Sequence, residues 1–123
     1  MSFEYAVVRA VPRTDRGELI NVGVVLYCQD ADFLGCATHL DADRLRCLDP
    51  QIDLTAVESA VDAVRAVCSG AAAGGRAAAG SRRERFGWLT APRSTVVQPG
   101  PVHSGMTDDP AAHLERLLRR LVR

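Results

Sequence analysis

Lysine is absent from this 123-residue chain, and all fifteen basic residues are arginines. The absence excludes a lysine Schiff base, a lysine general base and the lysine-dependent phosphate grip of a P-loop. Aromatic residues make up only 5% of the sequence, so the core must consist mainly of Val, Leu and Ala. Few aromatics also count against a base-stacking surface for nucleic acids. Anionic partners would have to be bound by arginine, whose planar guanidinium stays protonated.

The sequence also lacks targeting and catalytic signatures. No apolar run approaches the roughly 20 residues that span a membrane, and the N-terminal segment lacks the features of a signal peptide. We therefore expect a cytoplasmic protein without membrane contact. No GxSxG, HExxH, GxxxxGK[ST] or GxGxxG motif is present, so no established reaction type is indicated.

The four cysteines are widely spaced and form no CxxC pair. In a reducing cytosol such cysteines are expected to be small buried hydrophobes. A zinc site that combines cysteines with His39 or His103 is not favoured by the spacing. We expect neither a metal nor a cofactor.

The first third of the chain predicts a three-stranded antiparallel meander, with strands at residues 5–12, 19–28 and 33–40. Each segment is rich in Val, Leu or aromatic residues and ends at turn-forming residues. A four-residue loop would set Cys28 opposite Phe33 and Val25 opposite Cys36. In the second strand, period-two alternation places Val22, Val24 and Leu26 on one face and Asn21, Gly23, Val25 and Tyr27 on the other.

The remaining two-thirds predict helices and one late strand. The expected helices span residues 41–48, capped by Asp41, residues 54–68, with capping-box spacing at Thr55 and Glu58, and a last helix begun by Asp109 and Pro110. Residues 69–81 form an Ala/Gly-rich flexible linker, residues 82–93 a basic connector, and residues 94–100 a strand. The sum is one α+β domain over residues 1–123. It contains an antiparallel three- to four-stranded sheet, beginning with the meander, packed with about three helices.

Arg9, Asn21 and Gly23 are polar or small residues in strands that are otherwise apolar. Arg9 needs a carboxylate partner, which Asp15 or Glu18 could supply, or else a bound anion. Asn21 is disfavoured in a central strand unless its amide is hydrogen-bonded. Gly23 predicts a bulge or the close approach of another segment.

The stretch from Thr90 to Gly105 allows two interpretations. Its arginine and hydroxyl groups could hold a phosphate or carboxylate, and His103 could titrate near neutral pH. Alternatively, the stretch is an edge strand whose prolines protect it from aggregation. The full set of candidate ligand- or partner-binding residues is Arg9, Arg16, Glu18, Asn21, Arg93, Ser94, Thr95 and His103.

Residues 5–28 and 85–122 resemble a bacterial family described as domain of unknown function 3037. The most specific segments are Arg16 to Glu18 with Asn21 to Val24, followed by Ala91 to His103. The resemblance covers most of the chain and omits chiefly the Ala/Gly-rich linker. It implies no established activity, but it does imply that a kinase-like protein could be the partner.

Three functions stay open at this point. The first is a non-catalytic interaction or regulatory domain that binds a protein or itself through residues 113–123 or 82–93. Its charges are split, with eight acidic residues between Asp30 and Asp62 and five arginines between Arg76 and Arg93. The second is an anion- or nucleotide-handling ligand-binding domain or enzyme, based on Arg9, Glu18, Asn21, Arg93 and His103. The third, nucleic-acid binding through the arginines of residues 82–93, is disfavoured by zero net charge.

Overall fold

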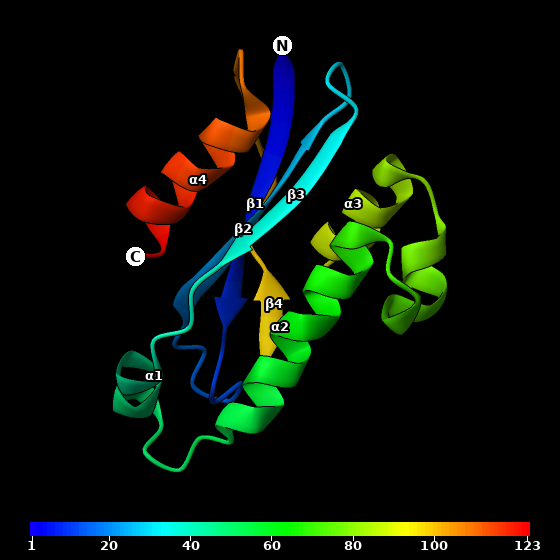
Figure 1. Ribbon diagram of the computed structural model, residues 1–123. Helices are drawn as coiled ribbons and strands as arrows, with labels where there is room; N and C mark the ends of the chain where they lie inside the picture. Colours follow the sequence, from blue (N-terminus) through cyan, green and yellow to red (C-terminus); the bar gives the residue numbers. More distant parts are fainter.

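An antiparallel five-stranded sheet forms the centre of the computed structural model, which describes all 123 residues, and helices lie on both of its faces (Figure 1). The strands are β1 (Ser2–Ala10), β2 (Ile20–Cys28), β3 (Phe33–Thr38), β4 (Val97–Pro99) and β5 (His103–Met106). The helices are α1 (Ala42–Leu48), α2 (Leu54–Ser69), the 3-10 helix η1 (Ala72–Ala79), α3 (Arg82–Thr90) and α4 (Pro110–Leu121). The predicted α+β class is confirmed, with more strands and helices than expected.

The predicted meander and its register are confirmed. Strands run in the order β3-β2-β1-β4, and β5 also pairs with β1. Cys28 pairs with Phe33 and Val25 with Cys36, because a four-residue turn joins β2 to β3. β1 is therefore the central strand, with β2 on one side and β4 and β5 on the other.

A β-bulge in β2 corrects the predicted faces of that strand. Val8 of β1 pairs with Gly23 and Arg9 pairs with Asn21, so Val22 has no partner on β1. The extra residue reverses the alternation. Val22 consequently packs in the same core cluster as Val25, and not with Val24 and Leu26 as period-two alternation predicted.

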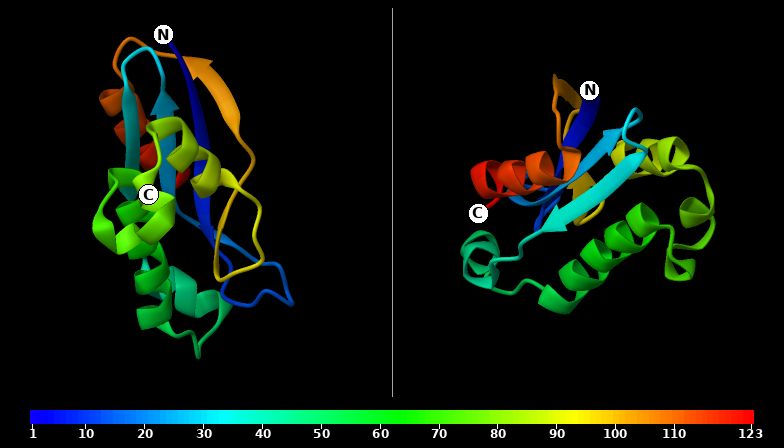
Figure 2. Two further views of the ribbon diagram at one scale, coloured as in Figure 1. Left: turned by 90° about the vertical axis from the view of Figure 1, so that its right-hand side faces the viewer. Right: turned by 45° about the horizontal axis from the view of Figure 1, so that its top comes forward.

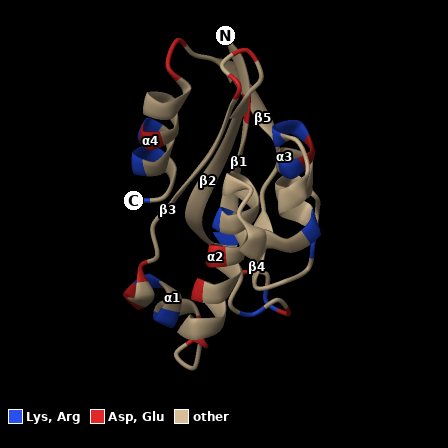
Figure 3. Ribbon diagram, turned by 45° about the vertical axis from the view of Figure 1, so that its right-hand side comes forward, with Lys and Arg blue, Asp and Glu red and all other residues tan.

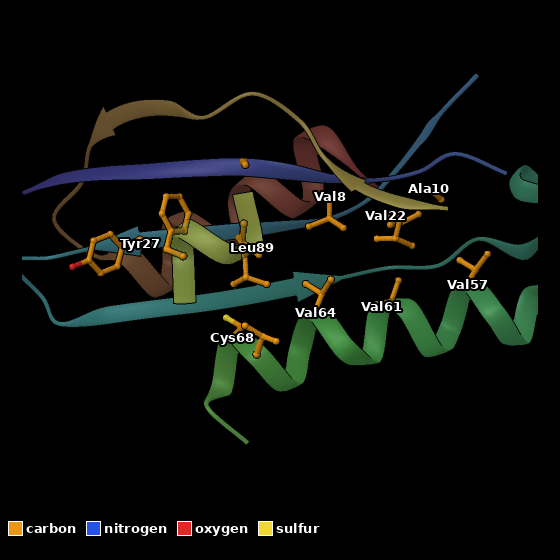
Figure 4. Packing of buried hydrophobic residues seen from close by; sticks show 14 of the residues in the cluster. Val8, Ala10, Val22, Tyr27, Val57, Val61, Val64, Cys68 and Leu89 are labelled. Atoms are coloured by element: carbon orange, nitrogen blue, oxygen red, sulfur yellow. The ribbon is translucent and has the colours of Figure 1, made fainter. Parts of the chain in front are cut away.

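Two hydrophobic cores lie on opposite faces of the sheet, and Figure 2 shows the helices that cover these two faces. The larger core lies between the sheet and helices α2 and α3, and Figure 4 shows Val57, Val61 and Val64 of α2 pointing toward the sheet. The smaller core lies between the sheet and α4, where Leu114, Leu117 and Leu118 contact the cluster that contains Val24 and Leu26. Both faces of β2 are therefore covered, which explains why nearly all of this strand is apolar.

Aspartates begin three of the helices. Asp41 accepts a hydrogen bond from the Arg44 amide and caps α1, and Asp109 caps α4 with Pro110 at its first position. Asp53 accepts from the Ala56 amide and caps α2. The predicted capping box at Thr55 and Glu58 is therefore wrong: both residues already lie inside the helix.

Residues 69–93 have more regular structure than the sequence indicated. Residues 72–79 of the predicted linker form η1, which packs against α2 and buries Ala78. The predicted flexibility of this segment is a dynamic property and stays a prediction. The predicted basic connector is wrong, because residues 82–90 form α3, which starts with a capping box between Ser81 and Glu84 and buries Phe86 and Leu89.

The late strand is split into two. β4 lies beside residues 8–10 of β1, and β5 lies beside residues 2–5. Pro101 interrupts them, since proline has no amide hydrogen to donate, while the Gly100 amide still donates to the Val7 carbonyl at 2.7 Å. Only β4 was predicted as a strand. None of the helices has the length and apolar character required to cross a bilayer.

Candidate interaction surface

Three arginines on α4 and the C-terminal Arg123 form a basic surface without acidic partners. We call Arg116, Arg119, Arg120 and Arg123 the α4 arginines; all four are exposed. None of them forms an ion pair, and Glu115 is the only acidic residue among positions 110–123. Figure 3 shows these basic positions toward the C-terminal end of the chain.

Six arginines elsewhere in the protein are paired with acidic residues. Arg82 contacts Asp32 at 3.0 Å and Arg83 contacts Glu4 at 2.6 Å, so both join α3 to the sheet. The other four pairs are Arg13–Asp15, Arg16–Glu18, Arg46–Asp43 and Arg65–Asp62. The positive charge of α3 is thus largely matched within the fold, whereas that of α4 is not.

The sheet and α1 hold α4 in a fixed position. Its leucines are buried against β2 and β3. The Asn21 side-chain amide donates to the Leu121 carbonyl at 2.9 Å, and Arg44 donates to the Val122 carbonyl at 3.0 Å. These two bonds satisfy carbonyls that a helix end leaves without partners. The predicted need for a hydrogen bond at the Asn21 amide is confirmed, and the surface is anchored at its C-terminal end.

Aromatic contacts connect α4 to β1, and β1 to β5. The His113 ring lies 4.5 Å from the Phe3 ring, and the Tyr5 ring lies 5.3 Å from that of His103, measured between centroids. Arg116 also reaches the Nδ1 atom of His113 at 3.3 Å. His113 therefore lies between the core and the basic surface.

Burial, together with the positive charges of Arg116 and Arg120, lowers the pKa of His113 below its ordinary value of 6.5. The unfolded chain then binds this proton more readily than the folded one, so folding stability should fall as the pH drops below about 6.5. His113→Phe keeps a ring on Phe3 and removes the titration. We expect its unfolding free energy to vary less between pH 7 and pH 5 than that of wild type in urea titrations. Parallel pH profiles for the two proteins would contradict this assignment.

Arg9 and Asn21, two of the predicted site residues, are paired across β1 and β2. The predicted carboxylate partners of Arg9 are wrong, because Asp15 pairs with Arg13 and Glu18 with Arg16 at 2.5 Å, both within their own loop. The Arg9 Nε and the Asn21 Oδ1 are buried and have no hydrogen-bond partner. The Arg9 guanidinium also lies against the backbone of Gly100.

The other candidates belong to separate local arrangements. The Arg93 guanidinium lies 4.2 Å from the Trp88 ring centroid and donates to the Trp88 carbonyl. Thr95 Oγ1 donates to the Val97 carbonyl at 2.6 Å, and Ser94 is exposed. These contacts shape the turn from α3 to β4. Arg16 and Glu18 lie in the exposed loop after β1, and His103 is exposed on β5 opposite Tyr5.

Sequence reasoning missed one feature with chemical potential, a cavity of about 450 Å³ between β3 and α2. Cys36 and Cys68 both line it, together with Arg65. The two cysteines are far apart in the sequence, and their spacing matches no cysteine motif. Cys68 did appear on the predicted apolar stripe of the helix, and Cys36 in a predicted strand. Only the packing of α2 on the sheet brings them together.

The fold and this surface define a small α+β domain in which an antiparallel sheet lies between helices and one helix presents unpaired basic charge. A family model described as "Protein of unknown function (DUF3037)" matches residues 5–122. The chain belongs to this family. No match was found among curated proteins or among solved structures.

Proposed function

We propose that this domain is a non-catalytic interaction domain that binds an acidic surface of a partner protein through the α4 arginines. The observation that carries the proposal is the contrast in pairing. All four α4 arginines are exposed without an acidic partner, while six arginines elsewhere are paired within the fold. Arginine is also enriched in protein interfaces, where its guanidinium pairs with carboxylates.

Electrostatics supports an acidic partner. Like charges one turn apart on a helix repel each other, and the α4 arginines have only Glu115 beside them. An acidic partner surface would relieve this repulsion and speed diffusional association. A regulatory role and a kinase-like partner, which the family resemblance suggests, are further parts of the same proposal.

The charges of the chain favour a different protein over a second copy as the partner of the α4 arginines. The acidic residues between Asp30 and Asp62 are largely engaged already. Three of them pair with arginines, and Asp41 and Asp53 cap helices. Little of this acidic charge is free to meet the α4 arginines of another copy.

The test is charge reversal on the surface of α4. Deletion of residues 113–123 is unsuitable, because it would remove Leu114, Leu117 and Leu118 from the core. We expect the triple variant Arg119→Glu, Arg120→Glu and Arg123→Glu to bind the partner at least about tenfold more weakly. The partner is first captured on the tagged wild-type protein from its own cells at low salt, identified by mass spectrometry and purified. Affinity is then measured by calorimetry.

The matched control carries the same change of charge elsewhere, in Arg13→Glu, Arg46→Glu and Arg76→Glu. We expect this control to bind nearly as tightly as wild type. Equal losses in both triple variants would indicate a general charge effect and reject α4 as the interface. Native mass spectrometry of the isolated chain gives its oligomeric state. A stable homodimer that is lost in the α4 triple variant would show that the surface binds a second copy of the chain and not a different protein.

A small-anion site is a second candidate, supported by one observation. The Arg9 Nε on β1 is a buried hydrogen-bond donor without a partner. A phosphate or carboxylate could accept hydrogen bonds from Arg9. A bound mass in native spectra that persists in the α4 triple variant and disappears in Arg9→Gln would favour this candidate over the interaction domain.

A further inference from the structure

Two cysteines from different elements share the wall of the 450 Å³ cavity between β3 and α2. Cys36 lies on β3 and is half-buried, whereas Cys68 lies near the C-terminal end of α2 and is only 4% exposed. Both are free thiols. Cys36 is therefore the more accessible of the two thiols.

Arg65 supplies positive charge to this cavity. It lies three residues before Cys68, and so on the same side of α2. Asp62 contacts its guanidinium at 2.8 Å, and the guanidinium also donates to the Thr38 hydroxyl. These partners hold the charge at the mouth between α2 and the end of β3.

The two thiols have opposite acid–base properties. The neighbouring Cys68 thiol lowers the pKa of Cys36, and the charge of Arg65 lowers it further against the opposing effect of burial. The pKa of Cys68 is raised by its interaction with Cys36 and by burial. A thiolate is the nucleophile in disulfide chemistry. Cys36 is also the more exposed of the two thiols, so Cys36 has the character of the attacking cysteine and Cys68 that of the resolving one.

We propose that Cys36 and Cys68 form a thiol–disulfide exchange site whose substrate is a low-molecular-weight disulfide entering the cavity between β3 and α2. The Cys36 thiolate attacks one sulfur of the substrate RSSR, forming a mixed disulfide and releasing RS⁻, which takes up a proton. Cys68 then loses its proton and attacks the Cys36 sulfur, and the second RS⁻ leaves and is protonated. The protein thiols are oxidised to one disulfide, and RSSR is reduced to two RSH.

The remaining cysteines lack this combination. Cys28 is fully buried and its thiol donates to the Ser2 carbonyl at 3.4 Å. Cys47 is exposed on α1 and is not among the residues that line the cavity. Cys47 therefore serves as an internal reference for an ordinary accessible thiol. The cavity lies on the face of the sheet opposite α4, so this proposal is independent of the proposed function.

The experiment treats the reduced full-length protein with 2-hydroxyethyl disulfide and follows intact mass and peptide maps over time. In wild type, we expect a Cys36–Cys68 disulfide, seen as a loss of two hydrogens, and a mixed disulfide that persists on Cys47. Cys36 should react about tenfold faster than Cys47. Arg65→Gln should slow the reaction at Cys36 about threefold and leave Cys47 unchanged, because the lost charge acts only at the cavity.

Two variants separate the roles of the cysteines. In Cys68→Ala, the mixed disulfide on Cys36 should accumulate, whereas in Cys36→Ala, Cys68 should stay reduced because it is buried. Circular dichroism checks that each variant is folded, and the wild-type time course tests the proposal without them. A Cys47 that reacts faster than Cys36, or a wild-type protein that never forms the Cys36–Cys68 bond, would overturn it.

Discussion

Leu26→Ala is expected to lower the free energy of unfolding by about 3 kcal/mol, and the melting temperature by roughly 10 °C. Leu26 is fully buried on β2, and it belongs to the core between the sheet and α4. Removing its side chain loses the transfer free energy of the buried carbons. It also leaves a cavity that cannot close, because helices packed on both faces hold the sheet in place. Urea and thermal unfolding monitored by circular dichroism measure the change.

Leu19→Ala is the matched control for this prediction. Leu19 is 43% exposed in the loop before β2, so the same substitution should change the unfolding free energy by less than about 0.5 kcal/mol. A small effect at Leu26 would mean that α4 and its leucines do not pack on the sheet as described. Similar losses at both positions would show that burial does not distinguish them.

Much of the fold could be predicted because local signals agree with the tertiary arrangement. The turn between β2 and β3 fixes the pairing of Cys28 with Phe33, since a hairpin loop of known length determines register. The apolar stripe of α2 and the cap and proline that start α4 likewise depend on neighbouring residues alone. These signals act within a few positions of the chain, where sequence reasoning is strongest.

Other elements required long-range information or a signal that was overlooked. The bulge at Val22 depends on how β1 pairs with β2, so simple alternation assigned Val22 to the wrong face. β5 is short and polar, and pairing with β1 defines it as a strand. For α3 a local signal was present, because Ser81 and Glu84 have capping-box spacing. The density of arginines in residues 82–85 obscured it.

Of the candidate site, only the presence of charged residues could be predicted from the sequence. The charged segment 113–123 is visible in the sequence, but the unpaired state of its arginines follows from where the acidic residues lie in space. The carboxylate expected beside Arg9 is absent because Asp15 and Glu18 form shorter-range pairs with arginines of their own loop. An ion pair between residues close in the sequence costs little chain entropy. With fifteen arginines along the chain, many such local pairs can form.

The pairing of charges also explains how one chain with zero net charge can carry a basic surface. Arg82 pairs with Asp32 and Arg83 with Glu4, so their charges are matched within the fold. Each exposed pair is worth little in stability, but it removes positive charge from that side of the molecule. The charge of α4 stays available because Leu114, Leu117 and Leu118 already hold this helix in place.

Gly23→Ala is expected to lower the free energy of unfolding by about 2 kcal/mol. A Cβ atom at position 23 would lie 2.9 Å from the Ala37 carbonyl oxygen and 3.0 Å from the Thr38 methyl group. The carbonyl belongs to the paired strand β3 and cannot rotate away as a flexible side chain would. One added methyl group therefore has to push β2 and β3 apart beside the bulge. Urea unfolding measures the loss.

Gly87→Ala is the opposing control, since it adds the same methyl group at an open position. Apart from the adjacent residues and the backbone of the helix itself, no atom lies within 4 Å of the Cβ site of Gly87, which is inside α3. Alanine should stabilise the protein there by about 0.5–1 kcal/mol, because glycine loses more backbone entropy in a helix. Opposite signs at the two positions would support both the close contact at Gly23 and the helical state of residues 82–90. A destabilising Gly87→Ala would contradict α3, and a neutral Gly23→Ala would contradict the close approach of β3.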